Sequence, residues 1–292
     1  MAPQLIRQGK IQILGQTINS VVYAVAEDSS TGLAKDSPSV LKGGTVWYEN
    51  REALGPGKGL KESDERARKE ATIYEALGHH DCILTYLGLE IAPVSCKGIP
   101  PIARAIRLER ASHGALRDYI VTTATNPPEG QTRLKLAVQF SESVAHIHGC
   151  NVIWGDLSTR NALLFDGLRL KLCDFAESDL MKNYPRDWYG CEDRYCPPGS
   201  ERPQFHNVRT VYQEIFALGT AIYGIVEWKV PYGSQTTEDE VLTALVDGIW
   251  PEISRNNPAE GVIRRCWEYK YESSQQAVDD LKILLLPSSP TK

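Results

Sequence analysis

The first hundred or so residues hold short runs in which apolar and polar positions alternate, and this pattern predicts a β-rich half of the chain. Strands are expected at residues 11–26 (two strands and a turn), 39–42, 83–91 and 102–108. A single long helix is expected over residues 61–77, with Ser63 or Asp64 as its N-cap and Gly78 after its end. Residues 43–59 are expected to form a long loop.

Beyond residue 112 the apolar positions recur every three or four residues, which predicts a helical second half. Helices are expected at residues 116–121, 132–148, 211–228, 241–247, 261–268 and 274–286. The helix at 211–228 is apolar around most of its surface and should therefore be buried. Ser112-His113-Gly114 is typical of a linker, so we divide the chain into domains 1–111 and 112–292. The predicted fold class is α+β.

Two short apolar runs in the middle of the chain flank the pair Asp166-Gly167, which favours the positive φ angles of a tight hairpin turn. Because a hairpin brings its two ends together, Asn161 and Asp174 should emerge at the same edge. Asp156 lies in the loop that leads to this edge. Three oxygen donors there suit a hard divalent cation and a general base, which is the layout of phosphoryl transfer. The alternative is a surface hairpin with ordinary polar loop residues.

Two charged residues and one turn of the first half are candidates for a nucleotide site. Lys42 ends an apolar strand, and Glu70 lies on the apolar stripe of the helix at 61–77, where a carboxylate needs a partner such as Lys42. The alternative is that both side chains are solvated. In the turn after residue 14, Gly15 stands where a phosphate-covering loop has the first of three glycines. A plain hairpin is the alternative for this turn.

Composition and charge narrow the functional classes. The chain is 42% hydrophobic and 24% charged with a formal net charge of −5, so we expect a globular protein that binds neither nucleic acid nor anionic membranes. No apolar run is long enough to span a bilayer, and the first ten residues lack the apolar core of a signal peptide. Seven cysteines without a CxxC pair predict free thiols and an intracellular location, cytoplasmic or nuclear.

The order of these features resembles the protein kinase fold over nearly the whole chain, from residue 11 to residue 285. The details are most similar to a fungal family of protein kinase-like domains. They are DLSTRN at 156–161, RYCPP at 194–198, FALG at 216–219, RCW at 265–267 and YES at 271–273. The resemblance implies a bilobal structure with a small β-rich N-lobe that has one main helix and a larger, mostly helical C-lobe.

The resemblance also implies roles for individual residues in a site for ATP and Mg²⁺. Lys42 would hold the α- and β-phosphates and pair with Glu70, and Asp156 would be the catalytic base. Asn161 and Asp174 would hold magnesium, and Arg160 would bring positive charge to the transferred phosphate. The nucleotide would further meet Gly15, the gatekeeper Leu108, the backbone of Glu109 and Ala111, and the apolar side chains of Val22, Val40 and Leu163.

Several positions depart from the kinase pattern. The usual H-R-D is Trp154-Gly155-Asp156, and Trp154 is expected to fill the space of the histidine in an aromatic stack with Phe175 and Tyr74. Gly155 removes the arginine that grips a phosphorylated activation segment.

The segment from residue 174 to residue 198 has Ser178 as its only serine or threonine. We therefore expect activity that does not depend on Ser/Thr phosphorylation of this segment. Ala176 replaces a glycine, and Glu214 replaces an aspartate that anchors the catalytic loop, so a displaced anchor is expected.

Three functions follow from these patterns. The first is a protein kinase that transfers the ATP γ-phosphate to a protein hydroxyl, with serine or threonine favoured; a protein substrate and a monomer are expected. The second is a catalytically weak pseudokinase that acts as a nucleotide-binding scaffold. The third is a small-molecule phosphotransferase, because Gly155-Asp156 followed by Asn161 resembles the H-G-D-x4-N pattern of aminoglycoside and choline kinases.

Overall fold

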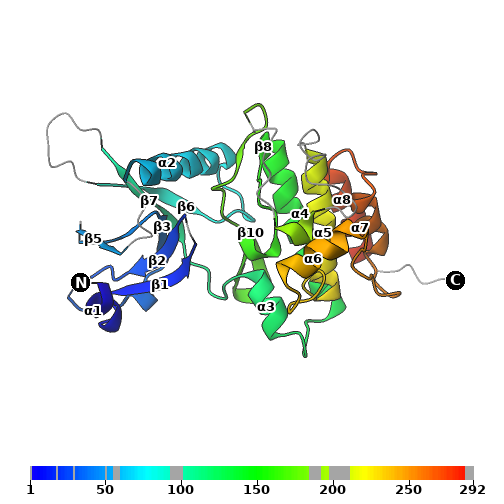
Figure 1. Cartoon of the computed structure of the whole chain (residues 1–292), viewed down its shortest axis with the longest axis horizontal. Helices are drawn as coiled ribbons and strands as arrows, with labels where there is room; N and C mark the ends of the chain where they lie inside the picture. The colour runs from blue at the N-terminus through cyan, green and yellow to red at the C-terminus, as the bar shows by residue number, and fades with distance from the viewer. Residues whose placement is uncertain are drawn as a thin grey trace. The chain divides into compact units, whose positions relative to one another are not determined.

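The computed structural model describes residues 2–17, 19–28, 30–49, 51–54, 60–92, 101–183, 192–196 and 211–286. The chain divides into two compact units, Met1–His79 with Leu84–Arg110 and His80–Ile83 with Ala111–Lys292. The first unit contains a sheet and helix α2, and the second contains helices α3 to α8 (Figure 1).

The first unit is built on a five-stranded antiparallel sheet with the strand order β1-β2-β3-β7-β6. Its strands are β1 (Ile11–Gln16), β2 (Val21–Val25), β3 (Ser39–Gly43), β6 (Tyr86–Ile91) and β7 (Ala103–Glu109). The predicted strands are confirmed. The prediction of a long loop over 43–59 is wrong in part, because β4 (Val46–Tyr48) and β5 (Arg51–Leu54) pair there as a hairpin, and residues 55–59 lie outside the described residues.

The hairpin forms where a loop was expected because Val46 is fully buried in the core of the sheet, together with Tyr23 and Leu41. The Tyr23 hydroxyl also accepts a hydrogen bond from the backbone N–H of Trp47 at 3.2 Å. A short helix α1 (Ala2–Arg7) and a 3₁₀ turn η1 (Ala34–Asp36) complete the unit.

Helix α2 (Leu60–Leu77) buries one face, as its three-to-four spacing predicts. Gly78 follows it with a φ of +65°, which suits glycine at this position. The predicted N-caps are wrong, because the helix begins before them. Instead, the Ser63 hydroxyl accepts a hydrogen bond from the Gly44 N–H at 3.1 Å, and the Asp64 carboxylate accepts one from the Ala103 N–H.

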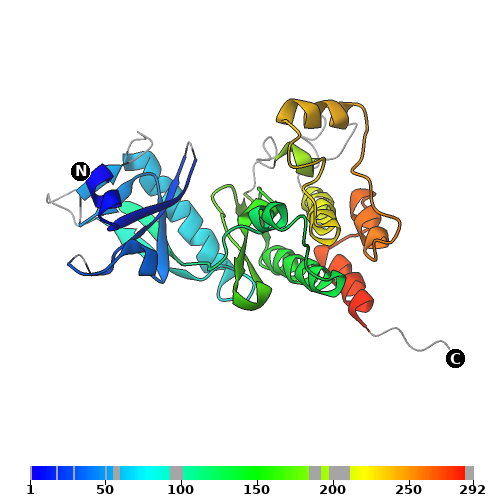
Figure 2. The same ribbon diagram turned by 90° about the horizontal axis from the view of Figure 1, so that it is seen from below.

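The second unit is mostly helical (Figure 2). Its helices are α3 (Leu116–Thr122), α4 (Gly130–Gly149), α5 (Val211–Glu227), α6 (Glu238–Val246), α7 (Glu260–Trp267) and α8 (Ser274–Leu285). Helix α5 is buried from Gln213 to Val226 and contacts α4 and α7, while α4 also contacts α8. These helices confirm the prediction of a helical second half built around the segment at 211–228. None of the helices in the described part of the chain is both long and apolar enough to cross a bilayer.

Four short strands of the second unit form two antiparallel pairs. Strand β8 (Val152–Ile153) pairs with β11 (Asp179–Leu180), and β9 (Ala162–Phe165) pairs with β10 (Arg169–Leu172). The β9–β10 hairpin was predicted, but its turn has three residues, because Phe165 pairs with Arg169. Positive φ angles therefore fall on Gly167 (72°) and Leu168 (55°), not on Asp166.

Candidate active site

The β9–β10 hairpin places the two predicted metal-holding residues at adjacent ends of its strands. Ala162 pairs with Leu172, and the Asn161 carbonyl accepts a hydrogen bond from the Cys173 N–H at 2.9 Å. Asn161 therefore precedes one strand and Asp174 follows the other at the same edge, as the sequence predicts. Asp174 has a φ of +60°, a left-handed conformation that is uncommon for aspartate and occurs often at functional sites.

Asp156 lies in the loop beside this edge and is held by Asn161. The Asn161 side-chain amide donates hydrogen bonds of 2.8 Å both to Asp156 Oδ2 and to the Asp156 carbonyl oxygen. Burial raises the pKa of the Asp156 carboxyl to about 6, an effect that Arg160 and Asn161 oppose and that the charges of Asp174 and Glu192 reinforce. Asp156, Asn161 and Asp174 are thus brought together, and Asp156 has a pKa suited to a general base.

The donor atoms at this edge are those that magnesium prefers. With its amide nitrogen bound to Asp156, the Asn161 side chain has a carbonyl oxygen left for a cation, and Asp174 contributes a carboxylate. The Ala176 N–H donates to Asp174 Oδ1 at 3.4 Å. Among the described residues, no cluster of three or more His, Cys, Asp or Glu side chains has metal-binding geometry.

Trp154 occupies the interior of the second unit, as predicted for the residue that replaces the kinase histidine. Its side chain is fully buried, with ring centroids 6.0 Å from Phe175 and 6.1 Å from Phe140. Its indole N–H donates to the Asp174 carbonyl oxygen at 3.0 Å. Tyr74, the third predicted member of the stack, belongs to the first unit and stacks on Tyr86 there. Trp154 therefore supplies both packing and a hydrogen bond to the backbone of the predicted metal ligand.

Glu214 binds the backbone of the loop that carries Asp156. Glu214 Oε1 accepts a hydrogen bond from the Gly155 N–H at 2.8 Å, and Oε2 accepts one from the Trp154 N–H at 3.1 Å. Oε2 also lies 2.8 Å from His148 Nε2, and His148 Nδ1 lies 2.9 Å from the Ser274 hydroxyl. The extra methylene of glutamate is accommodated because the carboxylate lies between α4 and the loop. A buried glutamate on an apolar helix signals a partner, and this signal could have identified His148.

Arg160 is engaged by two carboxylates, and one of them was missed in the sequence. Its Nη2 lies 3.5 Å from Asp156 Oδ1, and its Nε lies 3.2 Å from Glu192 Oε2. Glu192 also pairs with Arg117 at 2.8 Å and with Arg194 at 3.1 Å. Glu192 gives no periodic signal, because the sequence around it has no regular spacing of apolar residues; in the structure it directly precedes the 3₁₀ turn η4 (Asp193–Tyr195). The two prolines of the RYCPP motif also lie outside the described residues.

Ser178 is the only serine or threonine in residues 174–198, the predicted activation segment, and it is buried. Its side chain is 0% exposed and its hydroxyl donates to the Trp154 carbonyl oxygen at 2.6 Å. It immediately precedes β11, which pairs with β8. The hydroxyl is therefore a structural donor in this conformation and is inaccessible to a modifying enzyme.

In the first unit, Lys42 and Glu70 form the predicted ion pair. Lys42 Nζ lies 2.8 Å from Glu70 Oε1, and both side chains are 6% exposed. Lys42 lies on β3 opposite Val22 of β2 and Ile106 of β7, so the sheet fixes its position, while α2 supplies Glu70. The pair satisfies two charges that burial would otherwise penalise.

The turn between β1 and β2 is closed by its own side chains. The Thr17 hydroxyl oxygen accepts hydrogen bonds from the backbone N–H groups of Asn19 and Ser20 at 3.2 and 3.0 Å. Gly15 lies at an irregularity of the β1–β2 ladder, and a Cβ added there would meet no atom within 4 Å. Gly15 thus uses no freedom special to glycine in this conformation.

The residues predicted to surround adenine are distributed over both units. Val40 and Leu108 pair across β3 and β7 and are buried. The Glu109 carboxylate accepts hydrogen bonds from the N–H and hydroxyl of Thr85, both at 2.6 Å. Val22 lies on β2, and the remaining two, Ala111 and Leu163, are half-buried residues of the second unit.

Comparison with known protein families identifies the chain. Residues 57–278, more than half of the sequence, match the family described as protein tyrosine and serine/threonine kinase. The chain belongs to the protein kinase family. The fold class predicted from the sequence is thereby confirmed, with a β-sheet N-lobe and a helical C-lobe.

Individual kinases resemble the chain at low identity. It is 24% identical over 241 residues to mouse leucine-rich repeat serine/threonine-protein kinase 1, covering 77% of the chain and 11% of that protein. It is also 24% identical to the insulin receptor of Xenopus laevis, over 94% of the chain and 20% of the receptor. It is 24% identical to the serine/threonine/tyrosine-protein kinase HT1 of Arabidopsis thaliana, over 70% of the chain and 50% of that protein. The chain thus spans half or less of the length of these relatives.

Proposed function

We propose that this kinase domain transfers the γ-phosphate of ATP to a hydroxyl group of a protein, with serine or threonine favoured over tyrosine. The observation that carries the proposal is the Asp156–Asn161 arrangement, in which a half-buried carboxylate is held by the amide of the residue that precedes β9. Family membership supports the class of reaction, since protein kinases in general use ATP and Mg²⁺. We propose that the domains 1–111 and 112–292 are the N-lobe and the C-lobe.

Each residue has a defined task in this proposal. Asp156 accepts the proton of the substrate hydroxyl, and Asn161 and Asp174 hold magnesium, which neutralises charge on the phosphates. Arg160 brings positive charge to the transferred group. Lys42, oriented by Glu70, holds the α- and β-phosphates, and Gly15 lies in the turn that covers them. The base of the nucleotide meets Val22, Val40, Leu108, Glu109, Ala111 and Leu163.

The retained anchor of the catalytic loop favours catalysis over the pseudokinase alternative. Glu214 binds the N–H groups of Trp154 and Gly155, so the backbone that carries Asp156 is held without the H-R-D residues. The self-closed turn at Thr17 and the lack of glycine in the turn at residues 16–20 favour a weak enzyme or a nucleotide-binding scaffold. The third candidate, a small-molecule phosphotransferase, has no further observation in its favour.

Asp156→Asn tests the function directly. Asparagine keeps the shape and the hydrogen bond from Asn161 but cannot accept a proton, so phosphate transfer to a generic protein mixture should fall about 10²- to 10⁴-fold. The assay follows labelled γ-phosphate, and phosphoamino-acid analysis separates serine and threonine from tyrosine. Thermal shift with ATP and Mg²⁺ is measured on both proteins as a control for binding.

The outcomes separate the alternatives. Unchanged transfer by Asp156→Asn contradicts Asp156 as the base. A thermal shift without any transfer by the wild type indicates the scaffold, and transfer to small alcohols or amines but not to proteins indicates the small-molecule enzyme.

We also propose a monomer, membership of a fungal branch of the family and an intracellular location. Five free thiols among the described cysteines support the intracellular location.

A further inference from the structure

A group of apolar side chains is exposed on the second unit, at the end of helix α6 and directly after it. Val246, Ile249 and Trp250 are 78%, 54% and 42% exposed, and we name them the Trp250 surface. Trp250 is held in place, because its ring centroid lies 5.0 Å from that of Trp267 and 5.7 Å from that of Phe216. A large aromatic side chain that is both exposed and fixed is typical of a protein-binding anchor, since little side-chain entropy is lost on binding.

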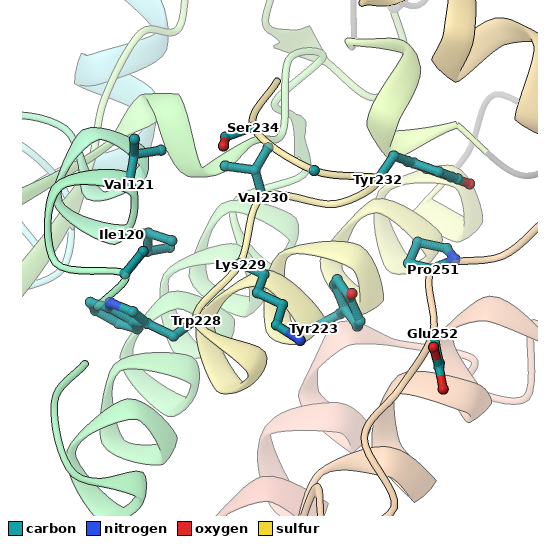
Figure 3. Close-up of a pocket in the computed structure, with 12 residues that line it drawn as sticks. Ile120, Val121, Tyr223, Trp228, Lys229, Val230, Tyr232, Ser234, Pro251 and Glu252 are labelled. Atoms are coloured by element: carbon teal, nitrogen blue, oxygen red, sulfur yellow. The ribbon is translucent and has the colours of Figure 1, made fainter. Parts of the chain in front are cut away.

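Two cavities flank the segment that follows Trp250, and Pro251 and Glu252 line both of them. The first has a volume of about 390 Å³ and is walled by apolar side chains of α3 and of the segment after α5, together with two tyrosines (Figure 3). These residues are Ile120, Val121, Trp228, Val230, Tyr223 and Tyr232. This cavity suits an aromatic or aliphatic side chain.

The second cavity, of about 510 Å³, offers a different chemistry. Its walls include the rings of Trp250 and Trp267 and the carboxylates of Glu252 and Glu268. The lining also includes a cation, Arg264, which is paired with Glu260 at 2.8 Å. Indole rings and carboxylates together attract a guanidinium or ammonium group.

Acidic side chains predominate in the segment that contains Trp250. Residues 234–254 contain five exposed acidic side chains and no lysine or arginine. These acidic residues are Glu238, Asp239, Glu240, Asp247 and Glu252. Lys229 lines the first cavity, but it is close enough to Glu227 to help lower the pKa of that carboxyl. A partner that complements this surface is therefore basic.

We propose that the protein substrate of this kinase docks on the Trp250 surface through a segment in which arginine or lysine flanks an aromatic or aliphatic side chain. The apolar side chain fills the first cavity, and the cation lies against the indole rings of the second. This inference rests on the proposed kinase function and names its substrate class. A second copy of the chain is a poorer partner, because each copy has a net charge of −5.

The docking surface is tied to the catalytic loop by ion pairs and hydrogen bonds. Arg194 donates to the carbonyl oxygens of Pro231 and Gly233, both at 2.7 Å, and Gly233 lines the first cavity. Arg194 also pairs with Glu192, which pairs in turn with Arg160. Because these links are within one unit, the first cavity has a fixed position relative to Asp156. A fixed distance lets docking select where along its substrate the enzyme acts.

The test measures binding of two labelled peptides to the full chain by fluorescence anisotropy. One peptide carries arginine pairs on either side of a phenylalanine and contains one serine; the other has glutamate in place of each arginine. Glu252→Lys with Glu268→Lys should weaken binding of the arginine peptide at least tenfold without disturbing packing, because both side chains are exposed. Glu65→Lys with Glu75→Lys, at two exposed positions on α2, is the control with the same change of net charge.

Trp250→Ala should also weaken binding of the arginine peptide. Ile283→Ala should not, although the Ile283 side chain on α8 is 61% exposed. Equal binding of the two peptides, or unchanged binding by the double variant, overturns the proposal. A wild-type dimer that Trp250→Ala dissociates, measured by analytical ultracentrifugation, also overturns it, because the surface is then taken by a second copy.

Steady-state kinetics with the arginine peptide separate this proposal from the kinase function. The double variant should raise KM and leave kcat unchanged, since neither glutamate belongs to the catalytic machinery. Transfer with normal KM in the double variant contradicts docking and leaves the kinase function standing. Charge-dependent binding without transfer contradicts the kinase function, and the surface then has no role in substrate selection.

Discussion

The catalytic loop of the second unit and the β1–β2 turn of the first both depart from the kinase sequence pattern, but with different structural results. In the loop, Glu214 binds the Trp154 and Gly155 N–H groups, and the Trp154 indole binds the Asp174 carbonyl. In the turn, Thr17 binds the N–H groups of Asn19 and Ser20, which an open phosphate-covering loop would direct at its ligand. Buried departures are thus compensated by new partners, whereas the exposed turn has closed on itself.

Lys42→Ala should give the largest effect on stability. It leaves the Glu70 carboxylate buried without its lysine, and breaking one partner of a buried pair costs about 3–5 kcal/mol. Urea unfolding measures the loss. The double variant Lys42→Met/Glu70→Leu should recover most of it while nucleotide-induced thermal stabilisation stays absent. A single variant as stable as the wild type would contradict a buried pair.

Glu214→Ala should destabilise the protein by about 3 kcal/mol, because two buried N–H groups of the catalytic loop lose their acceptor. Glu227→Ala is the matched control near the exposed end of the same helix; it loses bonds to Ser254 and Asn257 and should cost about 1 kcal/mol. Equal losses of unfolding free energy in the two variants would show that Glu214 stabilises the protein no more than an ordinary surface glutamate.

The pH dependence of catalysis should follow Asp156. As the proposed base it must be ionised, so with a pKa of about 6 the rate should fall about tenfold per pH unit below 6 and level off above. The folded state favours the protonated carboxyl, so the stability from this group is complete below its unfolded pKa of 3.8. It is lost as pH rises through 6. Denaturant titrations of wild type and Asp156→Asn check the sign, since the variant should lack this loss.

Two glycine variants, one in the loop that carries Asp156 and one in the β1–β2 turn, should have the smallest effects on stability and should still differ from each other. Gly155→Ala should cost about 1–2 kcal/mol, because Gly155 has a φ of +84° that side chains rarely adopt. Gly15→Ala should change stability by less than about 0.5 kcal/mol, because its Cβ meets no atom. Thermal unfolding of both variants, with and without ATP and Mg²⁺, measures this difference. A large loss of nucleotide stabilisation in Gly15→Ala would indicate that the turn opens around phosphate.

Periodicity was sufficient to predict the strands of the sheet, α2 and the helices around α5, because each follows from the burial of one face. It could not predict the β4–β5 hairpin, whose stability depends on Val46 reaching a core built from distant strands. At the site, the predicted hairpin was sufficient to place Asn161 and Asp174 at the same edge. The carboxylate of Glu70 on an apolar helix face was sufficient to predict its ion pair with Lys42. The role of Glu192 could not be predicted, because two of its three arginine partners, Arg117 and Arg160, are distant in the sequence.

The bond between the Trp154 indole and the Asp174 carbonyl has a pharmacological consequence. A ligand that binds only when the peptide after Asp174 is rotated must first break this bond and leave a buried indole N–H without an acceptor, at a cost of about 1–3 kcal/mol. The apparent affinity of a ligand is its intrinsic affinity multiplied by the fraction of molecules in the conformation that can bind it. Such compounds should lose about five- to a hundredfold in potency here, relative to kinase domains whose corresponding peptide is not held by a tryptophan.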